Sequence, residues 1–380
     1  MGRRFIHLGY IFLLVSSWVH FLTFPDSLYT FLMSINLHTK KSNDVKSCLQ
    51  TNQSVPIETF GGHSDSIKKN VQLCSSLSSY KIELTGTTKV LFRDKSKFAF
   101  VANEGGTVNG VGDTVGFQQS SNLKFFTKQL VVWETETFLL FRSLIQSDMT
   151  YIGFGEWIGP TILYSAQLAM ESFGLEPDAI AYRHLILNAV ANHCFGDRLK
   201  VFPYCIHSHT GSMGLKNAFG GSGSTLSLSN EDSSHVQSIE CTTLSVFLAN
   251  HSLINRKLFI KVDIEGSEPL LFSQFVQISN QLLHKPTWFI SKHANEIYQN
   301  QNIRESLLEL AGMYKCARYA PASHETAFSD EMIQNFKVST LNKIDMLFPF
   351  DATSNPDMIL VDEDCLAVDE KIRQSVQFFV

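Results

Sequence analysis

The spacing of hydrophobic and polar residues divides the chain into regions with different periods. Between residues 80 and 105, the segments YKIELTG, KVLFRD and KFAFVANEG alternate apolar and polar positions. Alternation of this kind is typical of half-buried antiparallel strands. The glycine-rich run GGTVNGVGDTVG, which overlaps the end of the last segment, predicts hairpin turns. We therefore expect a small β-rich extension over residues 80–130.

Residues 131–380 show the order of elements that is typical of an α/β domain. The segment WETETFLLFRSLI has its apolar residues at helical spacing, and the run MTYIGFG predicts a buried parallel strand. Gly159 and Pro160 then begin a helix, because proline is favoured at the first helical position. A strand over residues 173–175, a helix over 182–190 and a strand over 258–264 extend the pattern.

Acidic residues stand at the carboxyl ends of two of these strands. Glu176 follows the second strand, about 20 residues beyond the glycine turn, where an acid can accept the ribose hydroxyls of an adenosine. Asp263, Glu265 and Glu268 end the later apolar strand. Three carboxylates would repel a pyrophosphate but suit a sulfonium, an amine or a helix N-terminus. This cluster disfavours a nicotinamide oxidoreductase.

The N-terminal residues form a separate apolar segment. After Arg3 and Arg4, residues 5–24 carry no charge, and about 20 such residues span a bilayer as a helix. The positive-inside rule then places the rest of the chain across the membrane, as in a signal anchor with its main domain on the lumenal or extracytoplasmic side. A cleaved secretory or organelle-targeting leader is the alternative. Residues 25–79 follow as a polar stem, with the main domain over 131–380.

Cysteine spacing and charge narrow the classes of partner. The chain has seven cysteines without a C-x-x-C motif. Cys48 and Cys74 could pair in an oxidising compartment, but most of the cysteines are expected to be small buried side chains. A net charge of -5 without a basic run does not predict a surface that binds nucleic acid. His207 and His209 lack a third ligand nearby, so no metal site is predicted.

Three segments resemble the signature blocks of the FkbM-type S-adenosylmethionine-dependent methyltransferases: YIGFGEWIGPTILYSA, GLEPDAIAYRHLILNAVAN and KVDIEGSE. The resemblance covers roughly residues 130–300, and Lys261 to Glu268 match the family form of the last block in full. It implies a Rossmann-like class I methyltransferase fold, with a mixed, mostly parallel sheet of about seven strands and helices on both faces.

The resemblance also assigns the cofactor, S-adenosyl-L-methionine, to residues of this chain. It implies that glycines in the first block allow close approach, that Glu176 holds the ribose, and that Asp263 lies beside the methyl-transfer end. The full set of implied cofactor-binding residues is Gly153, Gly155, Glu156, Trp157, Gly159, Glu176, Pro177, Asn192 and Asp263. The family typically methylates oxygen on sugars or other small molecules, which implies a small-molecule or glycan acceptor here.

The first block departs from the family at one position. The family usually has an aspartate where this chain has Gly153, and a small residue where it has Glu156. Glu156 could supply the missing carboxylate from three residues further along. The alternative is a non-catalytic relative that binds a ligand or a partner.

Methyl transfer needs alignment of the reactants and, for a weakly acidic hydroxyl, a base. Asp263 and His293 are the candidate catalytic residues, and a hydrogen-bonded histidine at a strand end is the alternative for His293. The Gly- and Ser-rich stretch from residue 211 to 235 predicts a loop without regular structure, either a substrate lid or a mobile loop.

Overall fold

The computed structural model describes one part of the chain, which lies within the unit Phe60–Val380. The predicted membrane anchor, the stem, Cys48 and Cys74 lie outside the described residues. Within them, no helix has both the length and the apolar character that a membrane span requires. The described residues are 81–91, 99–109, 125–126, 130, 133–216, 225–227, 236–291, 293, 300–320, 339–340 and 357–378.

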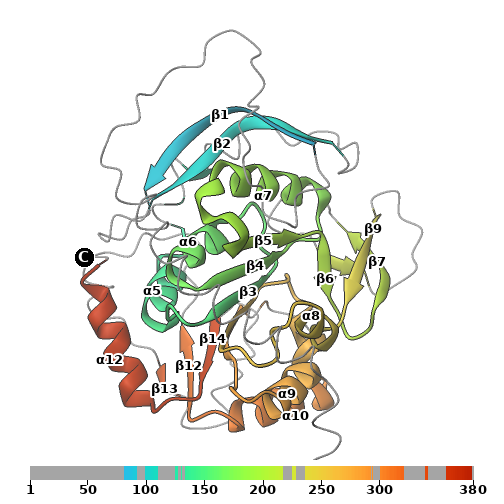
Figure 1. Cartoon of the computed structure of the whole chain (residues 1–380). Coiled ribbons are helices and arrows are strands. Elements are labelled where there is room, and N and C mark those ends of the chain that lie inside the picture. Colours follow the sequence, from blue (N-terminus) through green and yellow to red (C-terminus); the bar gives the residue numbers. More distant parts are fainter. Residues whose placement is uncertain are drawn as a thin grey trace, which may run out of the picture. The chain divides into compact units, whose positions relative to one another are not determined.

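The largest sheet of the described residues has eight strands in the order β13-β12-β14-β11-β10-β3-β4-β5 (Figure 1). The strands from β11 to β5 are all parallel, whereas β14 is antiparallel to both of its neighbours. This confirms the predicted mixed, mostly parallel sheet. Its strands are β3 (Thr150–Phe154), β4 (Glu171–Leu175), β5 (Leu199–Phe202), β10 (Leu258–Val262), β11 (Thr287–Ser291), β12 (Cys316–Ala320), β13 (Ser339–Thr340) and β14 (Asp357–Val361).

Helices cover both faces of this sheet, as predicted. Alternate residues of each strand point to opposite faces, so Tyr151 of β3 enters one core and Ile152 enters the other. The first core contains residues of α5 (Thr135–Leu144), α6 (Pro160–Leu168), α7 (Ala179–Ala191) and α12 (Cys365–Val376). The second contains residues of α8 (Leu244–Asn250), α9 (Phe272–Gln281) and α10 (Gln301–Gly312).

Two helices of the domain, α6 and α7, begin where the sequence provides a start. Pro160 occupies the first turn of α6, behind Gly159 in a left-handed conformation. Asp178 caps α7, because its side chain accepts the backbone N–H groups of Ile180 and Ala181. Short 3₁₀ helices at His193–Arg198 and Glu268–Leu271 complete the loops after α7 and β10.

Two smaller sheets are separate from the main one. In the first, β1 (Lys81–Leu91) pairs with β2 (Ala99–Asn109) in antiparallel fashion. The predicted break between two short strands is instead a register shift inside β1 near Gly86. The run after Glu104, predicted as turns, continues β2 as far as Asn109.

The second small sheet corrects the prediction for residues 211–235. This sheet has the order β6-β9-β7-β8, and two of its strands, β7 and β8, lie in that Gly- and Ser-rich stretch. Small residues do not prevent strand formation where a neighbouring strand supplies the hydrogen bonds, as β9 does for β7. The strands are β6 (Tyr204–Ile206), β7 (Gly211–Lys216), β8 (Thr225–Ser227) and β9 (Val236–Thr242).

Candidate functional site

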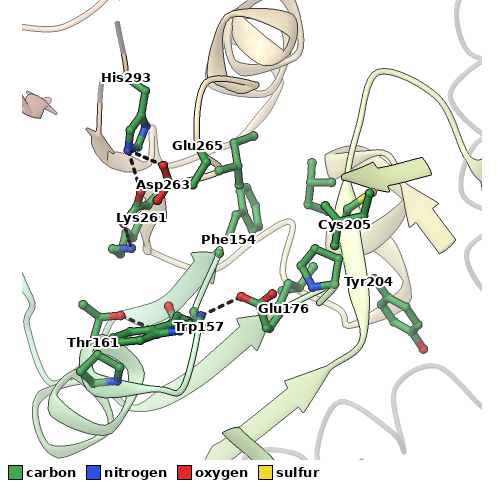
Figure 2. Close-up of a pocket in the computed structure, with 18 of the residues that line it drawn as sticks. Phe154, Trp157, Thr161, Glu176, Tyr204, Cys205, Lys261, Asp263, Glu265 and His293 are labelled. Carbon is green, nitrogen blue, oxygen red and sulfur yellow. Dashed lines mark hydrogen bonds and ion pairs between the residues drawn. The ribbon is translucent and has the colours of Figure 1, made fainter. Parts of the chain in front are cut away.

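A cleft of about 320 Å³ lies at the carboxyl ends of β3, β4 and β10 (Figure 2). This is the edge at which open α/β sheets bind their ligands, and the volume is in the usual range for small-molecule sites. Its lining combines apolar side chains with five acids and two bases. The residues are Trp133, Glu134, Phe154, Gly155, Glu156, Trp157, Pro160, Thr161, Leu175, Glu176, Pro177, Tyr204, Cys205, Ile206, Leu215, Lys261, Asp263, Ile264, Glu265 and His293.

The turn between β3 and α6 runs close to the end of β10. Gly155 has φ +76°, and a Cβ atom there would lie 1.7 Å from the backbone oxygen of Asp263. Only glycine fits, because it tolerates positive φ and has no side chain to collide with that carbonyl. Trp157 also has a positive φ, +47°. The turn thus brings its backbone and the β10 loop together at one wall of the cleft.

Glu156 is buried beneath the cleft in the space above Gly153. Its Oε1 accepts the hydroxyl of Tyr151 at 2.7 Å, and its Oε2 accepts the Thr161 hydroxyl at 2.7 Å and the Ile162 N–H at 2.9 Å. A Cβ atom on Gly153 would lie only 1.4 Å from Glu156 Oε1. The carboxylate of Glu156 therefore occupies the place where a side chain at position 153 would begin.

A second glycine makes room for the same side chain. Gly174 of β4 is the register partner of Gly153 of β3, and a Cβ atom on it would lie 3.0 Å from Glu156 Cγ. Burial raises the pKa of Glu156, while Lys261 and the hydrogen bonds from Thr161 and Tyr151 oppose this rise. The paired glycines, the three donors and the cation Lys261 show a space built around one carboxylate.

Glu176 is fixed by two backbone N–H groups at the end of β4. Its Oε2 accepts the N–H of Trp157 at 2.7 Å, and its Oε1 accepts the N–H of Asp178 at 2.8 Å. Burial raises the pKa of Glu176 to about 8, against the effect of these hydrogen bonds. Each carboxylate oxygen keeps a further lone pair, so the group can accept two ligand hydroxyls in a fixed orientation.

Lys261 is a buried cation among these acids. It belongs to β10, and its Nζ donates to Asp263 Oδ2 at 2.7 Å. Burial alone would lower the pKa of Lys261, but Asp263 and Glu156 raise it overall. Lys261 thus stays charged and compensates two acids that belong to different elements.

His293 joins three carboxylates at the end of β11. Its Nδ1 lies 2.9 Å from Glu268 Oε1, and its Nε2 lies 3.3 Å from Glu265 Oε2 and 3.6 Å from Asp263 Oδ1. Burial alone would lower the pKa of His293, but the hydrogen bond to Glu268 and the nearby carboxylates raise it to about 10. In this arrangement the imidazole carries a proton at neutral pH, so His293 donates rather than accepts.

Figure 2 shows the two sides of the cleft. His293, Asp263 and Lys261 gather on one side, and Glu176, Tyr204 and Cys205 lie toward the other. Between them, Trp157 forms its hydrogen bond to Glu176. The predicted residues that line the cleft are Gly155, Glu156, Trp157, Glu176, Pro177, Asp263 and His293.

Three other predicted residues support the cleft from outside its lining. Gly153 lies under Glu156, as described above. Gly159 has φ +100°, and a Cβ atom on it would lie 2.7 Å from Leu185 of α7. Asn192 caps the end of α7 and donates to the Asn188 carbonyl at 2.7 Å. These positions shape the elements that carry the site.

Sequence reasoning missed several lining residues that come from distant segments. Trp133 forms an aromatic wall with the predicted Trp157, and their ring centroids lie 6.3 Å apart. Tyr204 and Leu215 enter from the small inserted sheet, for which no motif exists. Lys261 is the missed residue that the sequence could most readily have identified, because a lysine inside an apolar strand needs a buried counter-charge.

Four of the described cysteines form disulfides, which the sequence did not predict, and three of them (Cys205, Cys241 and Cys316) are buried as expected. Cys205 and Cys241 face each other on β6 and β9 and form a disulfide. A second disulfide joins Cys316 of β12 to Cys365 at the start of α12. Spacings of 36 and 49 residues leave no local motif. Bonds of this kind are typical of oxidising, extracytoplasmic compartments.

Comparisons with known proteins add a distant likeness to methyltransferases. No protein-family model matches the chain, and no curated protein matches it. A solved structure of methyltransferase FkbM from Methylobacillus flagellatus KT shares 15% identity over 57% of this chain and 44% of its own, with a TM-score of 0.34. The precorrin-6y C5,15-methyltransferase of Geobacter metallireducens GS-15 shares 13% over 62% and 87%, with a TM-score of 0.29. This chain thus spans less than half the length of the first of these structures.

Proposed function

We propose that this protein binds S-adenosyl-L-methionine in the cleft and transfers its methyl group to a hydroxyl of a glycan or small molecule. The observation that carries the proposal is the carboxylate of Glu176, held by the N–H groups of Trp157 and Asp178 at the end of β4. It stands next to the glycine turn of β3, where an acid holds the ribose of an adenosine in folds of this type.

The charge of the lining supports a cationic ligand. Five acids and two bases line the cleft, and the bases, Lys261 and His293, already pair with acids. A bound sulfonium would favour the ionised form of the nearby acids, whereas a dinucleotide would bring a pyrophosphate close to Asp263 and Glu265. The lining therefore favours S-adenosyl-L-methionine over a nicotinamide cofactor.

The position of Glu156 supports compensation for Gly153. Its carboxylate fills the space where the family's aspartate side chain would begin. In the proposed complex, Glu156 supplies the negative charge near the methionine amino group. Methyl transfer then moves the methyl from sulfur to the acceptor oxygen, leaves a thioether, and releases the acceptor proton to a base.

The cofactor step is tested by isothermal titration of the full-length protein with S-adenosylmethionine and S-adenosylhomocysteine. We expect binding in the micromolar range, which Glu176→Gln should weaken at least about 100-fold, because the amide replaces one acceptor oxygen by an NH₂ group that faces a backbone N–H. Glu171→Gln is the matched control, since Glu171 lies at the opposite end of the same strand. Absence of binding in a folded sample, or equal affinities for the two variants, would remove the proposal.

The second candidate function is a non-catalytic relative that binds a ligand or partner. Its support is that both oxygens of Glu156 already accept hydrogen bonds from Tyr151, Thr161 and Ile162. Glu156→Gln separates the two functions, because it keeps the shape and removes the charge. If Glu156 compensates for Gly153, this variant loses cofactor binding, whereas unchanged binding by calorimetry would exclude the compensation.

A further inference from the structure

We propose that the loop after β10 and the end of β11 hold a divalent metal ion, with Asp263, Glu268 and His293 as its protein ligands. The sequence predicted no metal site, because these residues are separated in the chain and no motif joins them. The cluster borders the proposed acceptor end of the cleft, where Asp263 and His293 line the wall. The metal site itself does not depend on the proposed methyl transfer.

The geometry brings one donor atom from each ligand together. Asp263, Glu268 and His293 offer donor atoms that all lie within 4.8 Å of one another. The imidazole meets Glu268 through Nδ1 at 2.9 Å and faces Asp263 through Nε2 at 3.6 Å. Glu265 Oε2, 3.3 Å from Nε2, is close enough to supply a fourth donor. A cation would lie among them after small rotations of these side chains and release of the proton from His293.

A buried oxygen of Glu268 gives an independent indication of a missing ligand. The Glu268 side chain is 0% exposed, and its Oε1 takes the N–H groups of Ile264 and Gly266 as well as the contact with His293. Its Oε2, in the same carboxyl group, is buried and has no hydrogen-bond partner among the described residues. A buried carboxylate oxygen without a partner is costly, and a metal ion would satisfy it.

The donor set selects the kind of ion. Carboxylate oxygens suit Mg²⁺, Ca²⁺ and Mn²⁺, whereas an imidazole nitrogen suits Zn²⁺ and other transition metals. A site with two or three carboxylates and one imidazole therefore favours Mn²⁺, with Zn²⁺ as its main competitor. Lys261 holds the other oxygen of Asp263, and backbone N–H groups hold Glu268. These contacts fix the orientation of the two carboxylate ligands.

The role of the ion rests on the proposed function. A divalent cation beside the cleft would bind the acceptor hydroxyl and lower its pKa, so that the oxygen reacts without a strong protein base. The acceptor oxygen then forms a bond to the methyl carbon, the carbon–sulfur bond breaks, and the hydroxyl proton leaves to water. An acceptor with two neighbouring oxygens, such as a sugar diol, would suit this site best.

The test is titration of the metal-free full-length protein with Mn²⁺, with free Mn²⁺ measured by electron paramagnetic resonance. We expect one Mn²⁺ per chain, displaced by Zn²⁺. Glu268→Gln and His293→Ala should each weaken binding at least about 100-fold, because even outer-shell partners of metal ligands contribute about 10- to 100-fold. Glu268→Gln keeps an oxygen for the Ile264 and Gly266 N–H groups, and Glu171→Gln is the control.

Two results would overturn the metal site. One is the absence of saturable Mn²⁺ or Zn²⁺ binding in a sample whose circular dichroism shows the fold. The other is wild-type affinity in both Glu268→Gln and His293→Ala. The same samples titrated with S-adenosylmethionine separate the proposals: Mn²⁺ binding alone supports the metal site and contradicts methyl transfer, while cofactor binding alone contradicts the metal site.

Discussion

The two ends of the cleft hold their carboxylates by different means. At the β4 end, Glu176 is fixed by backbone N–H groups of Trp157 and Asp178. At the β10 end, Asp263 is held by the side chain of Lys261, and Glu265 faces that of His293. Backbone donors are set by the fold, whereas side-chain partners can rearrange when a ligand arrives.

This difference indicates that the two ends of the cleft bind different ligands. A carboxylate that is fixed by the backbone suits a ligand that is the same in every reaction, which is the role we propose for the adenosine. Asp263 and Glu265, which are held by side-chain charges, can exchange partners, and they suit an acceptor or a metal ion. Glu156 lies between the two ends and fills the space above Gly153. Changes at the centre should therefore disturb both ends, and changes at either side only one.

The largest effect is expected from Gly153→Asp, at the centre. Its Cβ would collide with the Glu156 carboxylate, and it would add a second buried acid. We expect a loss of about 3–5 kcal/mol in the free energy of unfolding, since an uncompensated buried charge costs this much. Urea denaturation measures it.

A double variant is the control for this prediction. Gly153→Asp with Glu156→Ala restores one carboxylate in the same space, so it should recover most of the stability and of the cofactor affinity. Wild-type stability in the single variant would show that Glu156 does not occupy that space.

The second-largest effect is expected from removal of the Cys205–Cys241 disulfide, which lies at the Glu176 side of the cleft. Replacing Cys205 and Cys241 by alanine should cost about 2–4 kcal/mol in unfolding free energy. It should also weaken S-adenosylmethionine binding about 10-fold, since Tyr204, Cys205 and Ile206 line the Glu176 side of the cleft. Thermal unfolding and calorimetry measure the two quantities.

The Cys316–Cys365 disulfide provides the matched comparison, because neither residue lines the cleft. Its removal should reduce stability by a similar amount and leave cofactor affinity unchanged. Equal losses of affinity in the two double variants would contradict a role specific to the Glu176 end.

The smallest effect concerns pH at the β10 side. Burial, followed by the charge of Asp263, raises the pKa of Asp357 to about 8. A carboxyl whose folded pKa is raised contributes stability at low pH and loses it as pH rises from about 4 through about 8. Asp357→Asn removes this loss, so between pH 5 and pH 6.5 the variant should gain on the order of 2 kcal/mol relative to wild type.

Denaturant unfolding at a series of pH values measures this gain. Asp362→Asn is the control, because Asp362 is half-exposed and pairs with Lys285 at 3.6 Å. It should change stability by less than about 1 kcal/mol at every pH. Parallel pH profiles for wild type and Asp357→Asn would show that Asp357 is ionised in the folded protein.

Local patterns in the sequence were enough to predict the elements that carry the cleft. The runs around Ile152 and Ile260 are apolar because both faces of their strands are covered by helices. Glu176 could be identified because an acid at this distance beyond a glycine turn has a position fixed by chain order. Asp263 and His293 followed from the rule that parallel strands end at the same edge.

The remaining features depend on contacts between distant segments. The pairing of Cys205 with Cys241 requires β6 and β9 to be neighbours, and nothing in their spacing encodes this. The approach of Asp357 to the acids of the β10 loop depends on β14 lying next to β11. The isolated oxygen of Glu268 is visible only when every neighbouring donor has been placed.

The most direct test of the central claim is a crystal structure of the full-length protein with S-adenosylhomocysteine. The account predicts both ribose hydroxyls on Glu176, the adenine against Tyr204 and Ile206, and the sulfur facing Asp263. A ligand bound outside the cleft, or an adenosine lying at the His293 end, would contradict it.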